Sequence, residues 1–183
     1  MNQGILILHP ENIDSHCDVQ QVTQLLLHNG LIGSAIHGMQ NSYSAGEKFL
    51  QLITFMGCSP HIRFEPEDEQ DKGYCYITLA ACETLQIRVS EHARPPRCCA
   101  CKKPVDKRWQ TAAAQGELIT CPHCHQQQRP DQLGWRNDSG MGHFFIEIHN
   151  IFPGEAQPVA RLLLQLQGID AAQWRYFYLH SLM

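Results

Sequence analysis

The sequence lacks several features that would place it in a well-defined class. No apolar run approaches the roughly 18 residues that a membrane-spanning helix needs, and the first ten residues carry no basic residue. We therefore expect neither a membrane span nor a secretory signal. The chain also has no phosphate-binding loop, no G-x-G-x-x-G motif and no G-x-S-x-G motif, which removes the commonest sequence evidence for an enzyme.

Charge is also scarce and unevenly distributed. Charged residues make up 17% of the chain and hydrophobic residues 43%, which is typical of a folded protein with a real core. The net charge of −4 argues against a general nucleic-acid coat. Residues 88–136 hold nine Lys/Arg and four Asp/Glu, so this segment carries +5 and the rest of the chain −9. The asymmetry indicates a separate role for the segment.

Cysteine, in contrast, is abundant. The nine cysteines cannot all pair, and clustered cysteines in a reducing compartment bind metal more often than they form disulfides. We therefore expect a cytoplasmic protein. Four cysteines without such spacing are expected to be small buried side chains: Cys17, Cys58, Cys75 and Cys82.

Four of the remaining five cysteines form two Cys-x2-Cys pairs. Cys98 and Cys101 are followed, after nineteen residues, by Cys121 and Cys124. A two-residue spacer lets two thiolates in a tight turn converge on one ion, and two such turns complete a tetrahedron. Because four protein ligands leave no open position, we expect one structural zinc ion per chain, with iron as the alternative metal.

These two pairs carry a family resemblance. The segments Cys-Cys-Ala-Cys-Lys-Lys-Pro (98–104) and Cys-Pro-His-Cys-His (121–125) resemble the knuckles of the zinc-ribbon class, which is related in shape to rubredoxin. The resemblance covers about a fifth of the chain and implies a metal site and a ribbon fold. The sequence departs from the class at Cys99, an extra thiol, and at Lys102 and His125, where glycine is common.

Hydrophobic periodicity and capping signals predict the elements around the ribbon. Asp18 is expected to cap a helix that ends at Asn29-Gly30, and a second capping box at 44–47 is expected to open a helix that ends at Gly57. A third helix is expected at 158–167, and strands are expected at 5–8, 61–65, 74–79, 85–90, 143–149 and 174–180. The last strand, helix and strand should form a β-α-β unit.

We therefore predict an α+β fold with a small mixed sheet, helices on one face, and an inserted four-cysteine zinc ribbon. The main domain comprises residues 1–93 plus 138–183, and the ribbon comprises 94–137. The other sheet face should be rich in Tyr, Arg and His, as binding surfaces often are. The residues expected on it are His61, Arg63, Glu65, Tyr74, Tyr76, Arg88, Tyr176 and Tyr178.

Three further groups are candidate sites. His143, Glu147 and His149 alternate along one strand and are the right ligand types for a catalytic metal. His143 and His149 are too far apart along a strand to share one ion, so a solvated sheet face explains these residues better. Cys58 with His61 is a candidate nucleophile and base, although a helix cap and turn explain this segment better. A basic cluster precedes Trp109, a potential stacking aromatic, in the ribbon: Lys102, Lys103, Lys107 and Arg108.

Three functions follow from these observations. The first is a binding or accessory protein, an adaptor or maturation factor that holds a protein partner and contains a structural zinc. The second is nucleic-acid binding through the basic ribbon hairpin. The third is a metal-dependent enzyme that uses the His/Glu strand face. The absence of catalytic motifs favours the first and argues against an enzyme, and the oligomeric state is left open.

Overall fold

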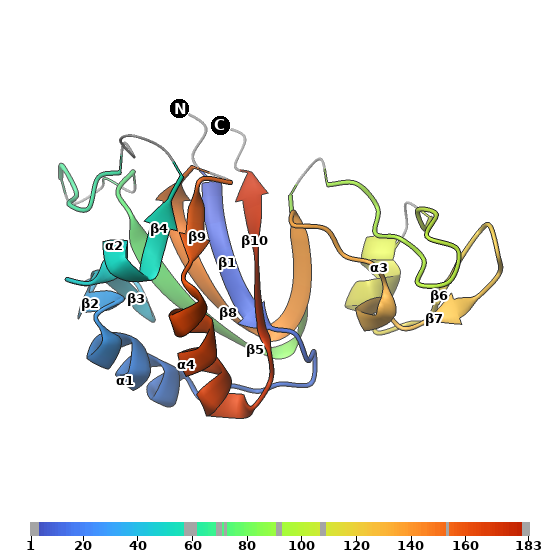
Figure 1. Cartoon of the computed structure of the whole chain (residues 1–183), viewed down its shortest axis with the longest axis horizontal. Helices are drawn as coiled ribbons and strands as arrows, with labels where there is room; N and C mark the ends of the chain where they lie inside the picture. Colours follow the sequence, from blue (N-terminus) through green and yellow to red (C-terminus); the bar gives the residue numbers. More distant parts are fainter. Residues whose placement is uncertain are drawn as a thin grey trace.

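The computed structural model describes residues 4–56, 62–68, 71, 73–90, 93–106, 109–152 and 154–180. Its centre is a six-stranded sheet in the order β10-β1-β8-β5-β3-β2 (Figure 1). The α+β class is therefore confirmed, although every described strand ladder is antiparallel rather than mixed. The strands of this sheet are β1 (Gly4–Pro10), β2 (Ile32–Ala35), β3 (Ser42–Ala45), β5 (Tyr76–Val89), β8 (Ser139–Ile151) and β10 (Trp174–His180).

The connections explain why parallel strands do not pair. The strand β8, the helix α4 (Ala160–Asp170) and the strand β10 form the predicted β-α-β unit, but β1 lies between the two strands and is antiparallel to both. In the same way, β1, the helix α1 (Val19–Asn29) and β5 form a unit with β8 between its strands. Two interlocked units of this kind are the split β-α-β topology.

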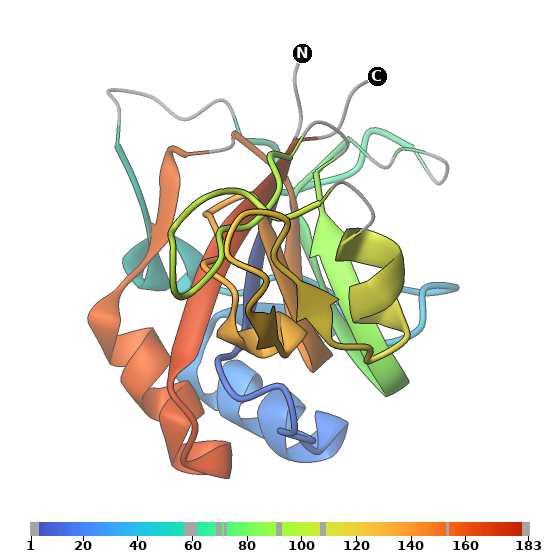
Figure 2. The ribbon, with the colours of Figure 1, turned by 90° about the vertical axis from the view of Figure 1, so that its right-hand side faces the viewer.

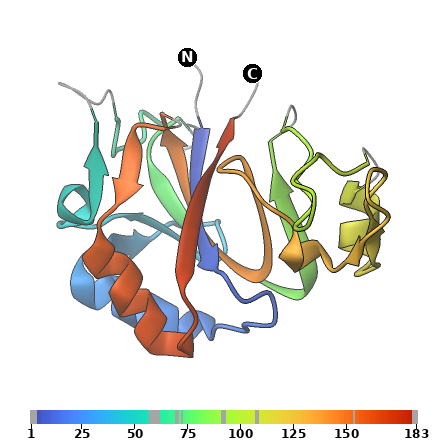
Figure 3. The ribbon, with the colours of Figure 1, turned by 45° about the vertical axis from the view of Figure 1, so that its right-hand side comes forward.

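The helices α1 and α4 lie on one face of this sheet (Figure 3). As predicted, Asp18 caps α1, because its carboxylate accepts the backbone N–H of Gln20 at 2.6 Å and of Gln21 at 3.3 Å. The helix ends at Gly30, whose φ of 79° is the left-handed conformation that glycine adopts without strain. The core between helices and sheet includes Leu6, Leu8, Val22, Leu26, Phe144, Ile146, Ile148, Leu162 and Leu166.

The second predicted helix is wrong for most of its length. Ser44 of the capping box lies in β3, where it pairs with Tyr76 of β5. Only one helical turn, α2 (Phe49–Leu52), forms, and the chain then enters β4 (Ile53–Phe55). This strand pairs with β9 (Ala156–Pro158). Sheet pairing prevails because β-branched and aromatic residues fit a pleated surface and lose rotamer freedom in a helix.

Two further predictions about strands need correction. The strands expected at 74–79 and 85–90 are both parts of β5, which continues through a register shift between Ala81 and Gln86. Residues 62–64 form no strand, and His61 lies outside the described residues. The helix α4 exists as predicted but runs past Gly168 and ends at Ala171, whose φ is 59°.

The cysteine-rich segment lies between β5 and β8 and projects from the end of the sheet (Figures 1 and 2). It contains α3 (Trp109–Ala114), the short strands β6 (Ile119–Thr120) and β7 (Gln127–Gln128), and a 3-10 turn at Pro130–Gln132. Its small apolar core reaches the sheet through Met141, which is buried with it. Partly buried side chains of β5 and of the loop after β1 also pack against this core: Ile13, Leu85, Ile87 and Val89.

Candidate metal centre and neighbouring sites

The two Cys-x2-Cys pairs form knuckles with the same backbone geometry. In the first knuckle the backbone N–H of Lys102 donates to the carbonyl of Cys98 at 3.0 Å, and in the second that of His125 donates to Cys121 at 3.0 Å. Lys102 and His125 have φ values of 61° and 58°, the left-handed region in which a side chain costs roughly 1–2 kcal/mol relative to right-handed backbone. This conformation explains why glycine is common at this position in zinc ribbons.

The four sulfur atoms converge on one point. The Sγ atoms of Cys98 and Cys124 lie 3.7 Å apart, and those of Cys101 and Cys121 lie 3.6 Å apart. A tetrahedral zinc with Zn–S bonds of ~2.3 Å requires sulfur atoms ~3.8 Å apart, so the arrangement fits this ion. Among the described residues, these four cysteines are the only group of three or more metal-ligating side chains whose ligand atoms all lie within 4.8 Å of one another.

The surroundings of the Cys98 sulfur atom favour the thiolate, the form that binds metal. A hydrogen bond from the backbone of Cys101 is the largest influence that lowers the pKa of Cys98, to about 6. The extra thiol of Cys99 does not belong to the cluster, and this residue is exposed. Its backbone N–H donates to Oε1 of Gln128 at 2.9 Å, which fixes the first knuckle against the second half of the ribbon.

Trp109 is buried inside the ribbon, whereas its position beside the basic cluster suggested an exposed ring that could stack on a base. This residue begins α3 and is 3% exposed, so its indole lies in the ribbon core rather than on a surface where a base stacks. Its ring contacts that of Trp135 edge to face, at 5.2 Å between centroids. Lys102 and Lys103 are exposed as expected, whereas Lys107 and Arg108 lie outside the described residues.

The predicted His/Glu strand face assembles only in part: Nε2 of His149 lies 3.7 Å from the Glu147 carboxylate, whereas His143 lies elsewhere. Glu147 accepts a hydrogen bond from Nε of Arg88 at 2.8 Å, and the two side chains form a half-buried ion pair. His149 stacks on Tyr76, with 4.3 Å between ring centroids and 11° between ring planes. Burial lowers the pKa of His149, so this imidazole is neutral at pH 7. His143 instead contacts His16, with 4.2 Å between ring centroids.

The expected aromatic face is also only partly correct. Tyr76 and Arg88 lie together beside Glu147 and His149 on the sheet face opposite the helices, but Tyr178 lies in the core beneath the helices and Tyr176 packs against it. The Tyr178 hydroxyl donates to the carbonyl of Ala156 at 2.5 Å. The expected register of β10 was therefore off by one residue, which exchanges the two faces of a strand.

The other residues predicted for the sheet face, and the single cysteines, lie at separate places in the structure. Tyr74 is buried, with its ring 5.7 Å from that of Tyr76. Arg63 forms ion pairs with Glu67 and Asp71 in the acidic loop, which also contains the exposed Glu65. Cys17 and Cys75 are buried as predicted and Cys82 is half-buried, whereas Cys58 and its candidate base His61 lie outside the described residues.

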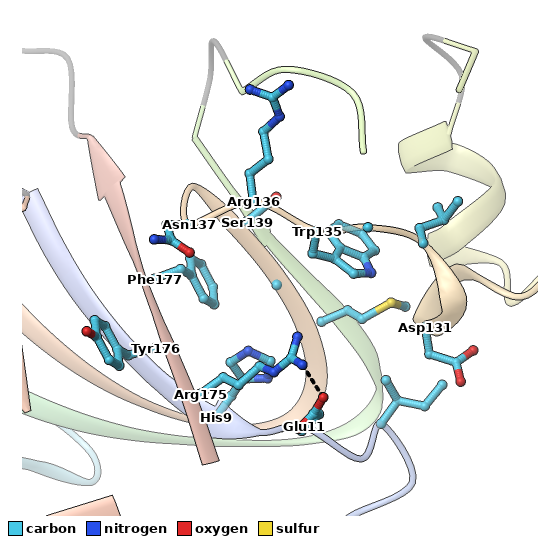
Figure 4. Close-up of a pocket in the computed structure, with 15 residues that line it drawn as sticks. His9, Glu11, Asp131, Trp135, Arg136, Asn137, Ser139, Arg175, Tyr176 and Phe177 are labelled. Carbon is cyan, nitrogen blue, oxygen red and sulfur yellow. Dashed lines mark ion pairs between the residues drawn. The ribbon is translucent and has the colours of Figure 1, made fainter. Parts of the chain in front are cut away.

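A cleft of about 360 Å³ lies between the base of the ribbon and the sheet (Figure 4). His9, at the end of β1, lines it and is 8% exposed, and its Nδ1 atom has no hydrogen-bond partner. Burial lowers the pKa of His9 to about 4. Arg175 pairs with His9 across β1 and β10 and forms an ion pair with Glu11. No sequence motif predicted this cleft, because its walls come from three separate segments, residues 9–13, 131–141 and 175–177.

Comparison with known proteins does not extend this description: no protein-family model, curated protein or solved structure matches the chain. None of the helices in the described part of the chain is long and apolar enough to cross a membrane.

Proposed function

We propose that this chain is a binding or accessory protein built around one structural zinc ion, whose ligands are Cys98, Cys101, Cys121 and Cys124. The observation that supports this is the convergence of the four sulfur atoms at distances of 3.6 and 3.7 Å across the two knuckles. Four protein thiolates saturate a tetrahedral ion, so the zinc organises the ribbon and offers no position for a substrate. Thiolate ligands also need a reducing compartment such as the cytoplasm.

The ribbon acts as an inserted unit, residues 94–137, within a main domain of residues 1–93 plus 138–183. In support of this division, the ribbon has an apolar core of its own, separate from the core beneath the helices. The insertion joins two adjacent antiparallel strands, β5 and β8, so the sheet closes without it. The ribbon is then free to carry the recognition surface.

The partner is a protein that inserts an apolar side chain into the ribbon. A hollow of about 530 Å³ lies along α3 and β6, and its walls include Ala112, Ile119 and Pro122. Leu118 is 56% exposed at this hollow. The walls also include Asp106 and Glu117, whose negative charges repel a phosphate backbone, so the hollow suits a protein side chain better than a nucleic acid. The burial of Trp109 also removes the aromatic platform that single-stranded nucleic acid would need.

Two matched surface substitutions test this proposal. Leu118→Lys places a charge in the ribbon hollow, whereas Leu164→Lys places the same charge on α4, where the leucine is 67% exposed. Partners co-purified with the natively expressed chain are quantified together with zinc. We expect one zinc per chain in both variants, and loss of a stoichiometric protein partner only with Leu118→Lys. Equal retention in both variants would refute the hollow as the binding surface.

Nucleic-acid binding is a second candidate, because one observation favours it. Arg97, Lys102 and Lys103 are exposed around the first knuckle, and none of them forms an ion pair within the described part of the chain. The test is the affinity for a short single-stranded oligonucleotide at 50 and 200 mM salt. A charge reversal at Lys102 and Lys103 that leaves both the affinity and its salt dependence unchanged would exclude this candidate.

A further inference from the structure

A pair of histidines, one of them in β8, lies close together outside the ribbon. His16, in the loop before α1, and His143, in β8, lie with their rings 4.2 Å apart and tilted by 36°. Both line a hollow of about 220 Å³ together with Cys82 and Glu83 of β5. These residues come from three segments that the sheet brings together, and none of them takes part in the ribbon.

A hydrogen bond fixes the tautomer of His143. Nδ1 of His143 lies 3.1 Å from the backbone carbonyl of Cys82. A carbonyl oxygen only accepts, so Nδ1 carries the proton and Nε2 keeps a free lone pair. A histidine whose other ring nitrogen donates to a backbone carbonyl is the usual arrangement of a metal ligand. Among these side chains, His16 and Glu83 are exposed, so an ion reaches the hollow directly from solvent.

We propose that His16 and His143 bind a divalent transition-metal ion of the zinc, nickel or copper type, with the Glu83 carboxylate or water completing its coordination. Two nitrogen atoms bound to one tetrahedral ion lie roughly 3.4 Å apart. The centroids of two imidazoles bound to one such ion lie roughly 5 Å apart. The rings, whose centroids are 4.2 Å apart, therefore open by rotation about their side-chain bonds when they bind the ion. Imidazole ligands suit these three metals.

The other side chains at the hollow determine how many coordination positions of the ion remain open. The thiol of Cys17 is directed to the carboxylate of Asp170, at 3.6 Å, and is not a ligand. With two imidazoles as its protein ligands, the ion keeps positions open for the Glu83 carboxylate, water or a substrate, in contrast to the saturated tetrathiolate. The site is independent of the ribbon zinc and goes beyond the binding function proposed above.

Nickel binding by the full chain tests the proposal. The chain, first shown to contain one zinc, is dialysed against increasing Ni²⁺, and bound nickel and zinc are both counted. We expect one nickel per wild-type chain with zinc retained. His16→Ala and His143→Ala should each weaken nickel binding at least tenfold, while His28→Ala, an exposed histidine on α1, should leave it unchanged.

The two histidine variants distinguish the loss of a metal ligand from the loss of the folded structure. His16 is exposed, so its replacement should leave the melting temperature unchanged, and it keeps the test valid if His143→Ala unfolds. The proposal is overturned if the wild type binds no nickel, if the His16 variant binds as tightly as the wild type, or if His28→Ala weakens binding equally. A chain that contains no ribbon zinc yet binds nickel through His16 refutes the proposed tetrathiolate and leaves this site standing.

Discussion

Replacing Cys121 with Ser should unfold the ribbon and leave the main domain folded. Cys121 is fully buried and supplies one of the four sulfur atoms, so its loss removes the metal. A structural zinc contributes on the order of 10 kcal/mol to a small module, more than the ribbon's few apolar side chains can replace. We therefore expect the ribbon of the variant to unfold while the sheet and its helices persist.

The positions of the helices and tryptophans determine how much the helical signal and the tryptophan fluorescence of this variant should change. α3 has 6 residues, whereas α1 and α4 have 11 each, so most of the far-ultraviolet helical signal should remain. Of the three tryptophans, Trp109 and Trp135 lie in the ribbon and Trp174 lies in the main core. Tryptophan emission should therefore move strongly towards that of exposed indole, and proteolysis should cut first within residues 94–137.

Cys99→Ser is the matched control, because this thiol is exposed and lies outside the sulfur cluster. It should retain one zinc per chain and the native fluorescence. Zinc loss in the Cys99 variant would show that the ligand assignment is wrong. A single cooperative loss of all helical signal in the Cys121 variant would show that the ribbon and the main domain fold as one unit.

Three further predictions concern stability, each measured by urea unfolding. Burial lowers the pKa of His9 to about 4, below the value near 6.5 of the unfolded chain, so the unfolded state binds the proton first as pH falls. The free energy of unfolding should fall by about 3 kcal/mol between pH 7 and pH 4, and His9→Asn should abolish most of this slope. Gly140→Ala should cost about 1–3 kcal/mol, because the added Cβ meets the ring of Phe177 and lies 2.9 Å from Nε2 of His9; an unchanged midpoint would contradict this packing. Asp18→Ala should cost about 1 kcal/mol through loss of the α1 cap, and no change would show that the cap is dispensable.

The features that were predicted correctly depend on residues that lie close together in the sequence. The spacing of Cys98, Cys101, Cys121 and Cys124 identified the group that the fold brings together, because two residues between ligands already impose a knuckle. The limits of α1 followed from Asp18 and Gly30, whose side-chain and backbone preferences act within one helical turn. The α+β class followed from the order of strands and helices.

Tertiary structure decided what depends on pairing across the sheet. The helix predicted to start at Ser44 does not form there, because Ser44 lies in β3, which pairs with β5. Tyr178 faces the helices because the register of β10 against β1 determines the face on which each side chain of β10 lies. His143 was expected on the same strand face as Glu147 but contacts His16, and it lies opposite the register shift in β5. Such contacts join segments far apart in the chain, so their energies are absent from any local window of sequence, whereas a knuckle or a helix cap is complete within a few residues.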